Sequence, residues 1–167
     1  MDRRHEALIP PAAVPWLSGL FALAALCVAW IAEYGFGLPP CELCYWQRYG
    51  YWAAIAVAMI AGFTQRESRA RIAALGVLFV AFLAVAGIAA FHAGIEYGWW
   101  QGFTACAGGL GSGQSAEELL AAIENAPIVR CDEPAFKLFG LSMAGYNFLY
   151  ALALAGFAAW GASRSRP

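Results

Sequence analysis

The chain has 167 residues, of which 62% are hydrophobic and only 13% are charged. A soluble domain of this length has roughly a quarter of its residues charged, so this chain cannot cover its surface with polar groups in water. The length suits one compact unit, and we expect residues 1–167 to form a single membrane domain. The net charge is −1 and no basic stretch is interleaved with aromatic residues, so nucleic acid is not an expected partner.

Four apolar stretches follow one another along the chain, at residues 16–32, 45–63, 72–91 and 141–162. Each is close to the roughly 20 residues that an α-helix needs to cross a bilayer. None alternates as a membrane barrel strand does, and a helix satisfies its backbone groups within the segment. The sequence therefore predicts an all-α, four-helix transmembrane bundle. The first stretch lacks a small-x-small cleavage site, so we expect it to be a retained helix.

The basic residues predict the orientation of this bundle. Most of them lie at the N-terminus, between the second and third stretches, and in the C-terminal tail: Arg3, Arg4, Arg66, Arg69, Arg71, Arg164 and Arg166. The positive-inside rule places these segments, and so both termini, in the cytoplasm. A short first loop (residues 33–44) and a long second loop (residues 92–140) then lie outside the cytoplasm.

The long second loop contains a candidate helix of its own. Ser115 and Glu118 have the spacing of a capping box, and the apolar Leu119, Leu120 and Ile123 follow. This pattern predicts a short amphipathic helix on the membrane surface; ordinary loop packing is the alternative interpretation.

Four of the five cysteines fall in the two outer loops. Cys41 and Cys44 lie in the first loop, and Cys106 and Cys131 lie in the second. Thiols outside the cytoplasm can form and keep disulfides. Four cysteines allow three connectivities, and local spacing favours Cys41–Cys44 with Cys106–Cys131. Cys27 lies within the first helix, where we expect it to pack as a small apolar residue.

The spacing of Cys41 and Cys44 favours redox exchange over a structural role. The loop that they close is so short that its disulfide contributes little chain-entropy stabilisation. The second helix begins near Cys44, and a thiolate is stabilised at a helix N-terminus. Arg48, four residues beyond Cys44, has two interpretations: it is an interfacial anchor, or it stabilises a Cys44 thiolate from the same helix face.

These features together resemble one family. They are the run from Pro39 to Arg48 around the cysteine pair, Cys106 in the second loop, Cys131 shortly before the segment Phe139 to Met143, and the stretch from His92 to Trp100. This ordered set resembles the disulfide bond formation protein B (DsbB) family over nearly the whole chain.

The resemblance implies a bundle in the inner (cytoplasmic) membrane of a bacterium, with its four loop cysteines on the periplasmic side. A DsbA-like periplasmic protein with a thioredoxin fold would reduce the Cys106–Cys131 disulfide, and internal exchange would pass the electrons to Cys41–Cys44. Cys44, held as a thiolate near Arg48, would then reduce ubiquinone, or menaquinone under low oxygen, while Arg48 polarises a carbonyl of the bound quinone. His92 and Asn147 have two interpretations each, as contacts of the quinone or proton carriers, or as ordinary polar residues.

Three other interpretations compete with this one. A membrane structural or transport protein with bystander disulfides would also be apolar and contain paired cysteines. A metal site made by the four cysteines is disfavoured because zinc sites usually use two tight ligand pairs, so we expect no metal. The chain also resembles vitamin K epoxide reductase, another four-helix thiol enzyme, but in that family the Cys-x-x-Cys pair usually follows the loop cysteines, whereas here it precedes them.

Overall fold

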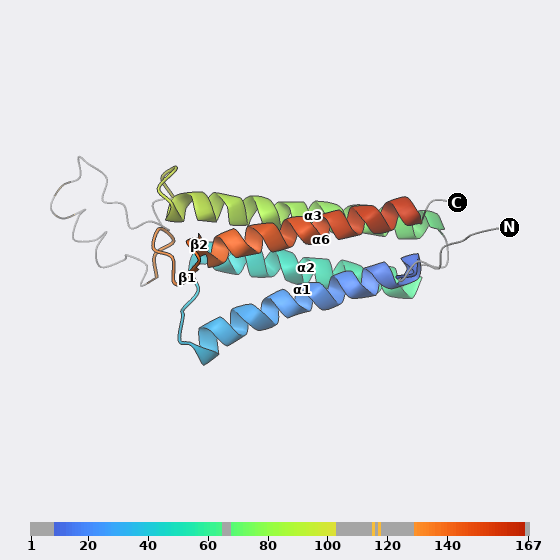
Figure 1. Ribbon diagram of the computed structural model, residues 1–167, viewed down its shortest axis with the longest axis horizontal. Coiled ribbons are helices and arrows are strands. Elements are labelled where there is room, and N and C mark those ends of the chain that lie inside the picture. Colours follow the sequence, from blue (N-terminus) through green and yellow to red (C-terminus); the bar gives the residue numbers. More distant parts are fainter. Residues whose placement is uncertain (1–8, 65–67, 103–114, 116, 118–128, 166–167) are drawn as a thin grey trace.

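The computed structural model describes residues 9–64, 68–102, 115, 117 and 129–165. Its long helices run side by side along the long axis of the molecule (Figure 1). Within the described residues they are α1 (Val14–Trp30), α2 (Glu42–Thr64), α3 (Ser68–Glu96) and α6 (Met143–Arg164). The predicted all-α bundle of four long helices is confirmed. The expected amphipathic helix after Ser115 lies largely outside the described residues and stays a prediction.

The helices have the lengths and compositions of membrane spans. Three segments are long and apolar enough to cross a bilayer: Pro11–Gly35, Arg69–Glu96 and Met143–Arg164. The fourth helix, α2, has 23 residues, which also suffices to cross the hydrocarbon core. A short π-helical segment, Ile31–Gly35, continues α1; such segments are rare and occur often at functional sites.

The helix ends differ from the predicted ones where the functional residues lie. α2 begins at Glu42 and α3 continues to Glu96, so Cys44 and His92 are helical residues rather than loop residues. These turns are polar or aromatic, and hydropathy alone assigned them to the loops. The start of α2, which carries Cys44, and the end of α3, which carries His92, therefore lie at the same end of the bundle.

The fourth helix is preceded by a small β-hairpin that the sequence analysis did not predict. Strand β1 (Lys137–Leu138) pairs antiparallel with β2 (Leu141–Ser142). The two turn residues, Phe139 and Gly140, have φ values of 50° and 80°, as a two-residue hairpin turn requires. Ser142 then caps α6, because its Oγ accepts a hydrogen bond of 3.1 Å from the Gly145 N–H. The expected helix start at residue 141 is therefore two residues too early.

Small residues let the helices approach closely, as is usual in membrane bundles. The buried core between the helices is rich in alanine, including Ala54, Ala58, Ala86 and Ala155. At Gly50 of α2, an added Cβ would lie 2.4 Å from a methyl carbon of Val85 on α3. This close approach brings the first turns of α2 against the last turns of α3.

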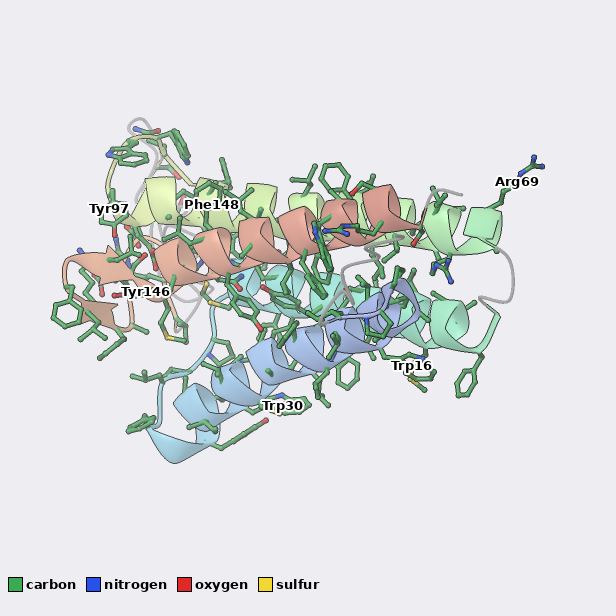
Figure 2. The ribbon with its side chains drawn as sticks, turned by 45° about the vertical axis from the view of Figure 1, so that its right-hand side comes forward. Trp16, Trp30, Arg69, Tyr97, Tyr146 and Phe148 are labelled. Atoms are coloured by element: carbon green, nitrogen blue, oxygen red, sulfur yellow. The ribbon has the colours of Figure 1, made fainter. Side chains whose placement is uncertain are left out.

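The two ends of the bundle carry different side chains. Figure 2 shows Arg69 projecting at one end, and Tyr97 and Tyr146 at the opposite end. Arg71 Nε donates a hydrogen bond of 3.0 Å to Ser165 Oγ, which ties the start of α3 to the end of α6. The end that carries Arg69 and Arg71 is thus the end away from the Cys41–Cys44 pair (Figure 2). That this end faces the cytoplasm stays a prediction.

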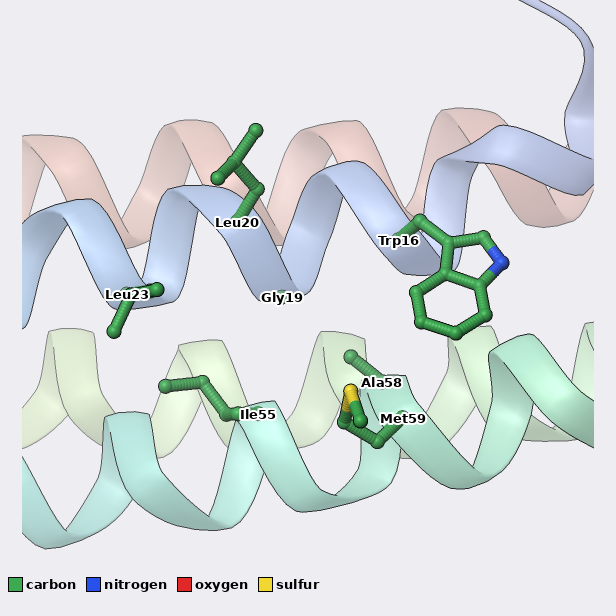
Figure 3. Close-up of a pocket in the computed structure, with 7 residues that line it drawn as sticks. All are labelled: Trp16, Gly19, Leu20, Leu23, Ile55, Ala58 and Met59. Carbon is green, nitrogen blue, oxygen red and sulfur yellow. The ribbon is translucent and has the colours of Figure 1, made fainter.

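A shallow apolar groove lies between α1 and α2 (Figure 3). Its volume is about 170 Å³, and its lining residues are Trp16, Gly19, Leu20, Leu23, Ile55, Ala58 and Met59. These residues lie several turns from the Cys41–Cys44 pair and contribute almost no polar surface, so the groove offers no chemistry of its own.

Candidate active site

Cys41 and Cys44 meet at the N-terminus of α2. Cys41 is the residue just before the helix, and its carbonyl accepts a hydrogen bond of 3.2 Å from the Tyr45 N–H. The two sulfur atoms lie 3.2 Å apart, and both cysteines are free thiols. A disulfide needs about 2.05 Å between the sulfurs, so the structure describes the reduced pair. The Cys41–Cys44 disulfide stays a prediction for the oxidised protein.

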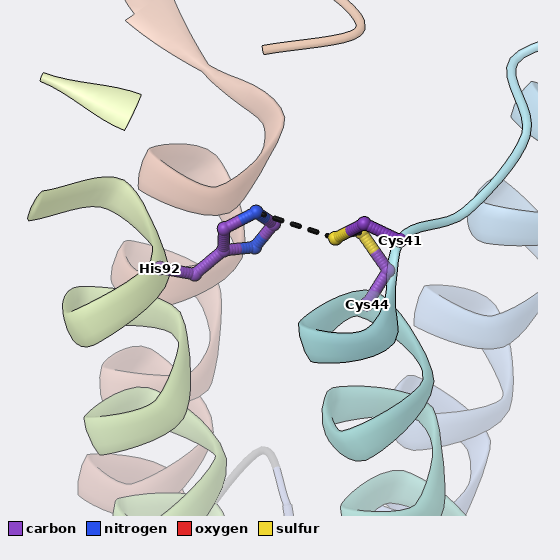
Figure 4. A group of neighbouring side chains, drawn as sticks. All are labelled: Cys41, Cys44 and His92. Atoms are coloured by element: carbon purple, nitrogen blue, oxygen red, sulfur yellow. Dashed lines mark hydrogen bonds between the residues drawn. The ribbon is translucent and has the colours of Figure 1, made fainter. Parts of the chain in front are cut away.

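His92 of α3 faces this pair from across the helix interface (Figure 4). Its Nε2 lies 3.5 Å from the Cys41 sulfur, and the residue is only 4% exposed. One turn further along α3, Glu96 Oε1 lies 3.7 Å from the same nitrogen. The other carboxylate oxygen of Glu96 is buried without a hydrogen-bond partner among the described residues. The structure therefore places His92 beside a redox sulfur; its expected role as a quinone contact or proton carrier stays a prediction.

Within the reduced pair, Cys41 is the cysteine whose pKa is lowered. The hydrogen bond with Cys44 holds the pKa of the Cys41 thiol well below its ordinary value; burial opposes this, while the hydrogen bond of His92 adds to it. The helix N-terminus acts in the same direction. The sequence analysis expected the thiolate at Cys44. The structure favours Cys41 instead, because α2 begins at Glu42 and because His92 contacts Cys41.

Cys131 lies against the same pair. It is completely buried and packs in one apolar cluster with Cys41, Leu43 and Ile95. Its backbone also hydrogen-bonds His92. Cys131 is disulfide-bonded, while Cys106, its expected partner, lies outside the described residues, so that pairing stays a prediction. The structure thus brings one second-loop cysteine to the cysteine pair of the first loop.

Arg48 has a partner that the sequence analysis did not name. Its Nη1 donates to the carboxylate of Glu33, its Nη2 donates to the Ala29 carbonyl at 3.3 Å, and its guanidinium lies 5.4 Å from the centre of the Tyr45 ring. Glu33 belongs to the π-helical segment after α1. The expected pairing of Arg48 with a Cys44 thiolate is therefore replaced by an ion pair between α2 and the end of α1. The quinone role of Arg48 stays a prediction.

A chain of polar side chains leads away from His92 into the bundle. Gln47 Nε2 lies 3.1 Å from His92 Nδ1, and Asn147 Nδ2 of α6 donates to Gln47 Oε1 at 2.6 Å. The Tyr51 hydroxyl in turn donates to Asn147 Oδ1 at 2.6 Å. Sequence reasoning missed Gln47 and Tyr51. The signal that could have revealed them was Asn147 within an apolar helix, because a polar side chain in a membrane needs a hydrogen-bonding partner.

Cys41, Cys44 and His92 also have the residue types of metal ligands. One sulfur or nitrogen atom from each lies within 4.8 Å of the others, and three protein ligands are typical of catalytic zinc sites. In this structure the Cys41 sulfur is instead the hydrogen-bonding partner of both Cys44 and His92. The expected absence of a metal stays a prediction.

The fold and this cluster define a class: a membrane-embedded thiol–disulfide protein. The family described as "Disulfide bond formation protein DsbB" matches residues 11–161, and the chain belongs to this family. A relative, "Uncharacterized protein RP370" from Rickettsia prowazekii (strain Madrid E), is 28% identical over 135 residues, which cover 80% of this chain and 77% of that protein. No solved structure matches the chain. Family membership makes the chain a membrane disulfide-generating oxidoreductase with thiol oxidase activity.

Proposed function

We propose that the chain reoxidises a DsbA-like thiol oxidase with a thioredoxin fold and passes the electrons to a membrane quinone, either ubiquinone or menaquinone. It would do so in a bacterial inner membrane, with its redox cysteines on the periplasmic side. The observation that carries this proposal is the burial of Cys131 against Cys41, at the end of the bundle away from Arg69 and Arg71 (Figure 2). A bystander disulfide has no reason to lie against a second cysteine pair.

The burial of the sulfurs suggests an order of electron transfer. The partner dithiol would first attack the Cys106–Cys131 disulfide of the second loop. The released Cys131 thiolate would then exchange with Cys41, its neighbour. Cys41 is only 5% exposed, whereas Cys44 is partly accessible and is the sulfur that would face the quinone. The balance is simple: two thiols lose two electrons and two protons, and the quinone takes up both to become a quinol.

The outer surface of α2 fits a planar, diffusible substrate. Tyr45, Trp46 and Tyr49 are exposed on the turns around Cys44, and aromatic side chains pack well against a flat ring. Arg48 lies one turn from Cys44 on the same helix, and its charged guanidinium already donates to Glu33 near the start of α2. These residues would hold the quinone while Cys44 supplies the reducing sulfur.

Two electron donors test the proposal on the purified protein in mild detergent. Loss of quinone absorbance is followed with a reduced DsbA-type protein or with dithiothreitol as the donor, for the wild-type chain and for Cys131→Ser. We expect the wild type to use both donors, and Cys131→Ser to keep only the small dithiol, which reaches Cys41–Cys44 directly. If the folded, disulfide-bonded wild type reduces neither quinone with either donor, a structural or transport role with bystander disulfides replaces the proposal.

Arg48 and Glu33 provide a matched pair of variants. If Arg48 binds a quinone carbonyl, Arg48→Ala should raise the quinone KM roughly tenfold to a hundredfold, since a hydrogen bond to a charged group contributes about 1.5–3 kcal/mol. Glu33→Gln keeps the guanidinium and releases it from its ion pair, so its quinone KM should be unchanged or lower. Should both variants raise KM equally and melt at the same reduced temperature, Arg48 only ties α2 to the end of α1.

A further inference from the structure

The polar chain formed by Gln47, Asn147 and Tyr51 has no part in the electron transfer proposed above. It nevertheless joins three helices in an otherwise apolar bundle: Gln47 and Tyr51 lie on α2, Asn147 lies on α6, and the chain ends at His92 on α3. Gln47 is only 6% exposed. Buried polar side chains in a membrane protein are costly and mark functional positions, so the direction of these hydrogen bonds is informative.

The Leu43 carbonyl determines how the Gln47 amide is turned. A carbonyl can only accept, and it lies 3.1 Å from Gln47 Nε2, so the NH₂ group of the amide must be on that side. The oxygen of the amide then faces Asn147 Nδ2 at 2.6 Å. The Tyr51 hydroxyl donates to Asn147 Oδ1, which leaves Asn147 Nδ2 to donate to Gln47. In this arrangement each of these hydrogen bonds joins a donor to an acceptor.

The orientation of Gln47 decides which nitrogen of His92 carries the hydrogen. The same NH₂ group lies 3.1 Å from His92 Nδ1, so Nδ1 must accept. In the neutral imidazole the hydrogen then sits on Nε2. Nε2 is the atom that lies 3.5 Å from the Cys41 sulfur and 3.7 Å from Glu96 Oε1, and both of these groups accept hydrogen bonds when ionised.

We propose that Gln47 and Asn147 are positioning residues that hold His92 as its Nε2–H tautomer, so that the ring N–H points at the Cys41 sulfur. The opposite tautomer would direct a nitrogen lone pair at a thiolate, which repels it. The proposal deepens the thiol-oxidase site and rests on the proposed function for its redox meaning. The tautomer itself requires neither a quinone nor a partner protein.

Nitrogen-15 NMR of the reduced protein in detergent reads the tautomer directly. The protein has two histidines, so in the His5→Gln variant all histidine ring signals come from His92. In this background we compare the unaltered site with Gln47→Glu, Asn147→Leu and a matched control, Gln101→Glu, which makes the same change at an exposed position. The side-chain carboxylate in Gln47→Glu can only accept, so it favours a hydrogen on His92 Nδ1.

The second measurement is the alkylation rate of Cys41 at neutral pH, located by mass spectrometry. The charged and titratable groups around this sulfur are Cys44 on α2 and His92 and Glu96 on α3, with Lys137 of β1 acting on Glu96; the variants leave all four in place. A charge-assisted hydrogen bond changes an equilibrium by roughly tenfold or more. We therefore expect Gln47→Glu and Asn147→Leu to alkylate roughly tenfold more slowly than Gln101→Glu.

The expected spectrum shows a hydrogen on Nε2 in the unaltered site and in Gln101→Glu, with a reversed or mixed tautomer in Gln47→Glu and Asn147→Leu. A hydrogen on Nδ1 in the unaltered site overturns the proposal, and this measurement does not depend on whether any variant folds. Unchanged tautomer and alkylation in folded Gln47→Glu also overturn it. Loss of quinone reduction with the expected tautomer present would contradict the proposed function and leave this inference standing.

Discussion

Replacing Cys44 with serine is expected to abolish quinone reduction, whichever dithiol supplies the electrons. Removing a nucleophile that acts in a concerted site commonly costs roughly 10³-fold or more, and a serine hydroxyl neither exchanges with a disulfide nor reduces a quinone. Cys44 is also the more exposed residue of the pair, since Cys41 is buried against His92 and Cys131. The measurement is the initial rate of quinone absorbance loss, with a reduced DsbA-type protein and with dithiothreitol in turn.

Cys27→Ser is the matched control for this experiment. Cys27 is a free, exposed cysteine of α1, and α1 lies within a candidate membrane span. We expect this variant to reduce quinone at the wild-type rate. Wild-type turnover by Cys44→Ser, or a folded but inactive Cys27→Ser, would each contradict the assignment of the quinone step to Cys44.

The overall bundle was predictable because hydropathy depends on local composition. Stretches of about 20 apolar residues have few alternatives to a membrane helix, and the four predicted stretches correspond to α1, α2, α3 and α6. The β-hairpin before α6 was not predictable in the same way. Its strands have two residues each, too few to show alternation, and its turn depends on Phe139 in a positive-φ conformation.

The chemistry of the candidate site depended on contacts between distant residues. The sequence identified the cysteines and Arg48 from their spacing, but it assigned the thiolate to Cys44, because it started α2 too late and could not place His92 beside Cys41. It also could not anticipate that Glu33, in a π-helical segment, pairs with Arg48. Gln47 and Asn147 lie 100 residues apart, and nothing local indicates that they share a hydrogen bond.

The reduced protein is expected to alkylate at Cys41 with a rate that changes little between about pH 6 and pH 8. A thiol of ordinary pKa is only about 3% ionised at neutral pH, so its alkylation rate rises roughly tenfold for each pH unit below that pKa. The pKa of Cys41 is lowered, first by its hydrogen bond with Cys44 and then by His92. The thiolate is therefore already formed across this range, and raising the pH adds little more. The measurement is the rate of iodoacetamide labelling at Cys41 as a function of pH, resolved by mass spectrometry.

The variants assign this behaviour to its physical causes. Cys44→Ala removes the hydrogen bond of the neighbouring thiol, which is the largest cause of the shift, so the pKa of Cys41 should rise and the flat profile should become a rising one. His92→Ala removes the next favourable contact and should act in the same direction, with a smaller effect. Glu42→Gln, at an exposed acidic residue between the two cysteines, is the control and should keep the flat profile. A wild-type profile that rises tenfold per pH unit would show that the charge of the reduced pair does not reside on Cys41.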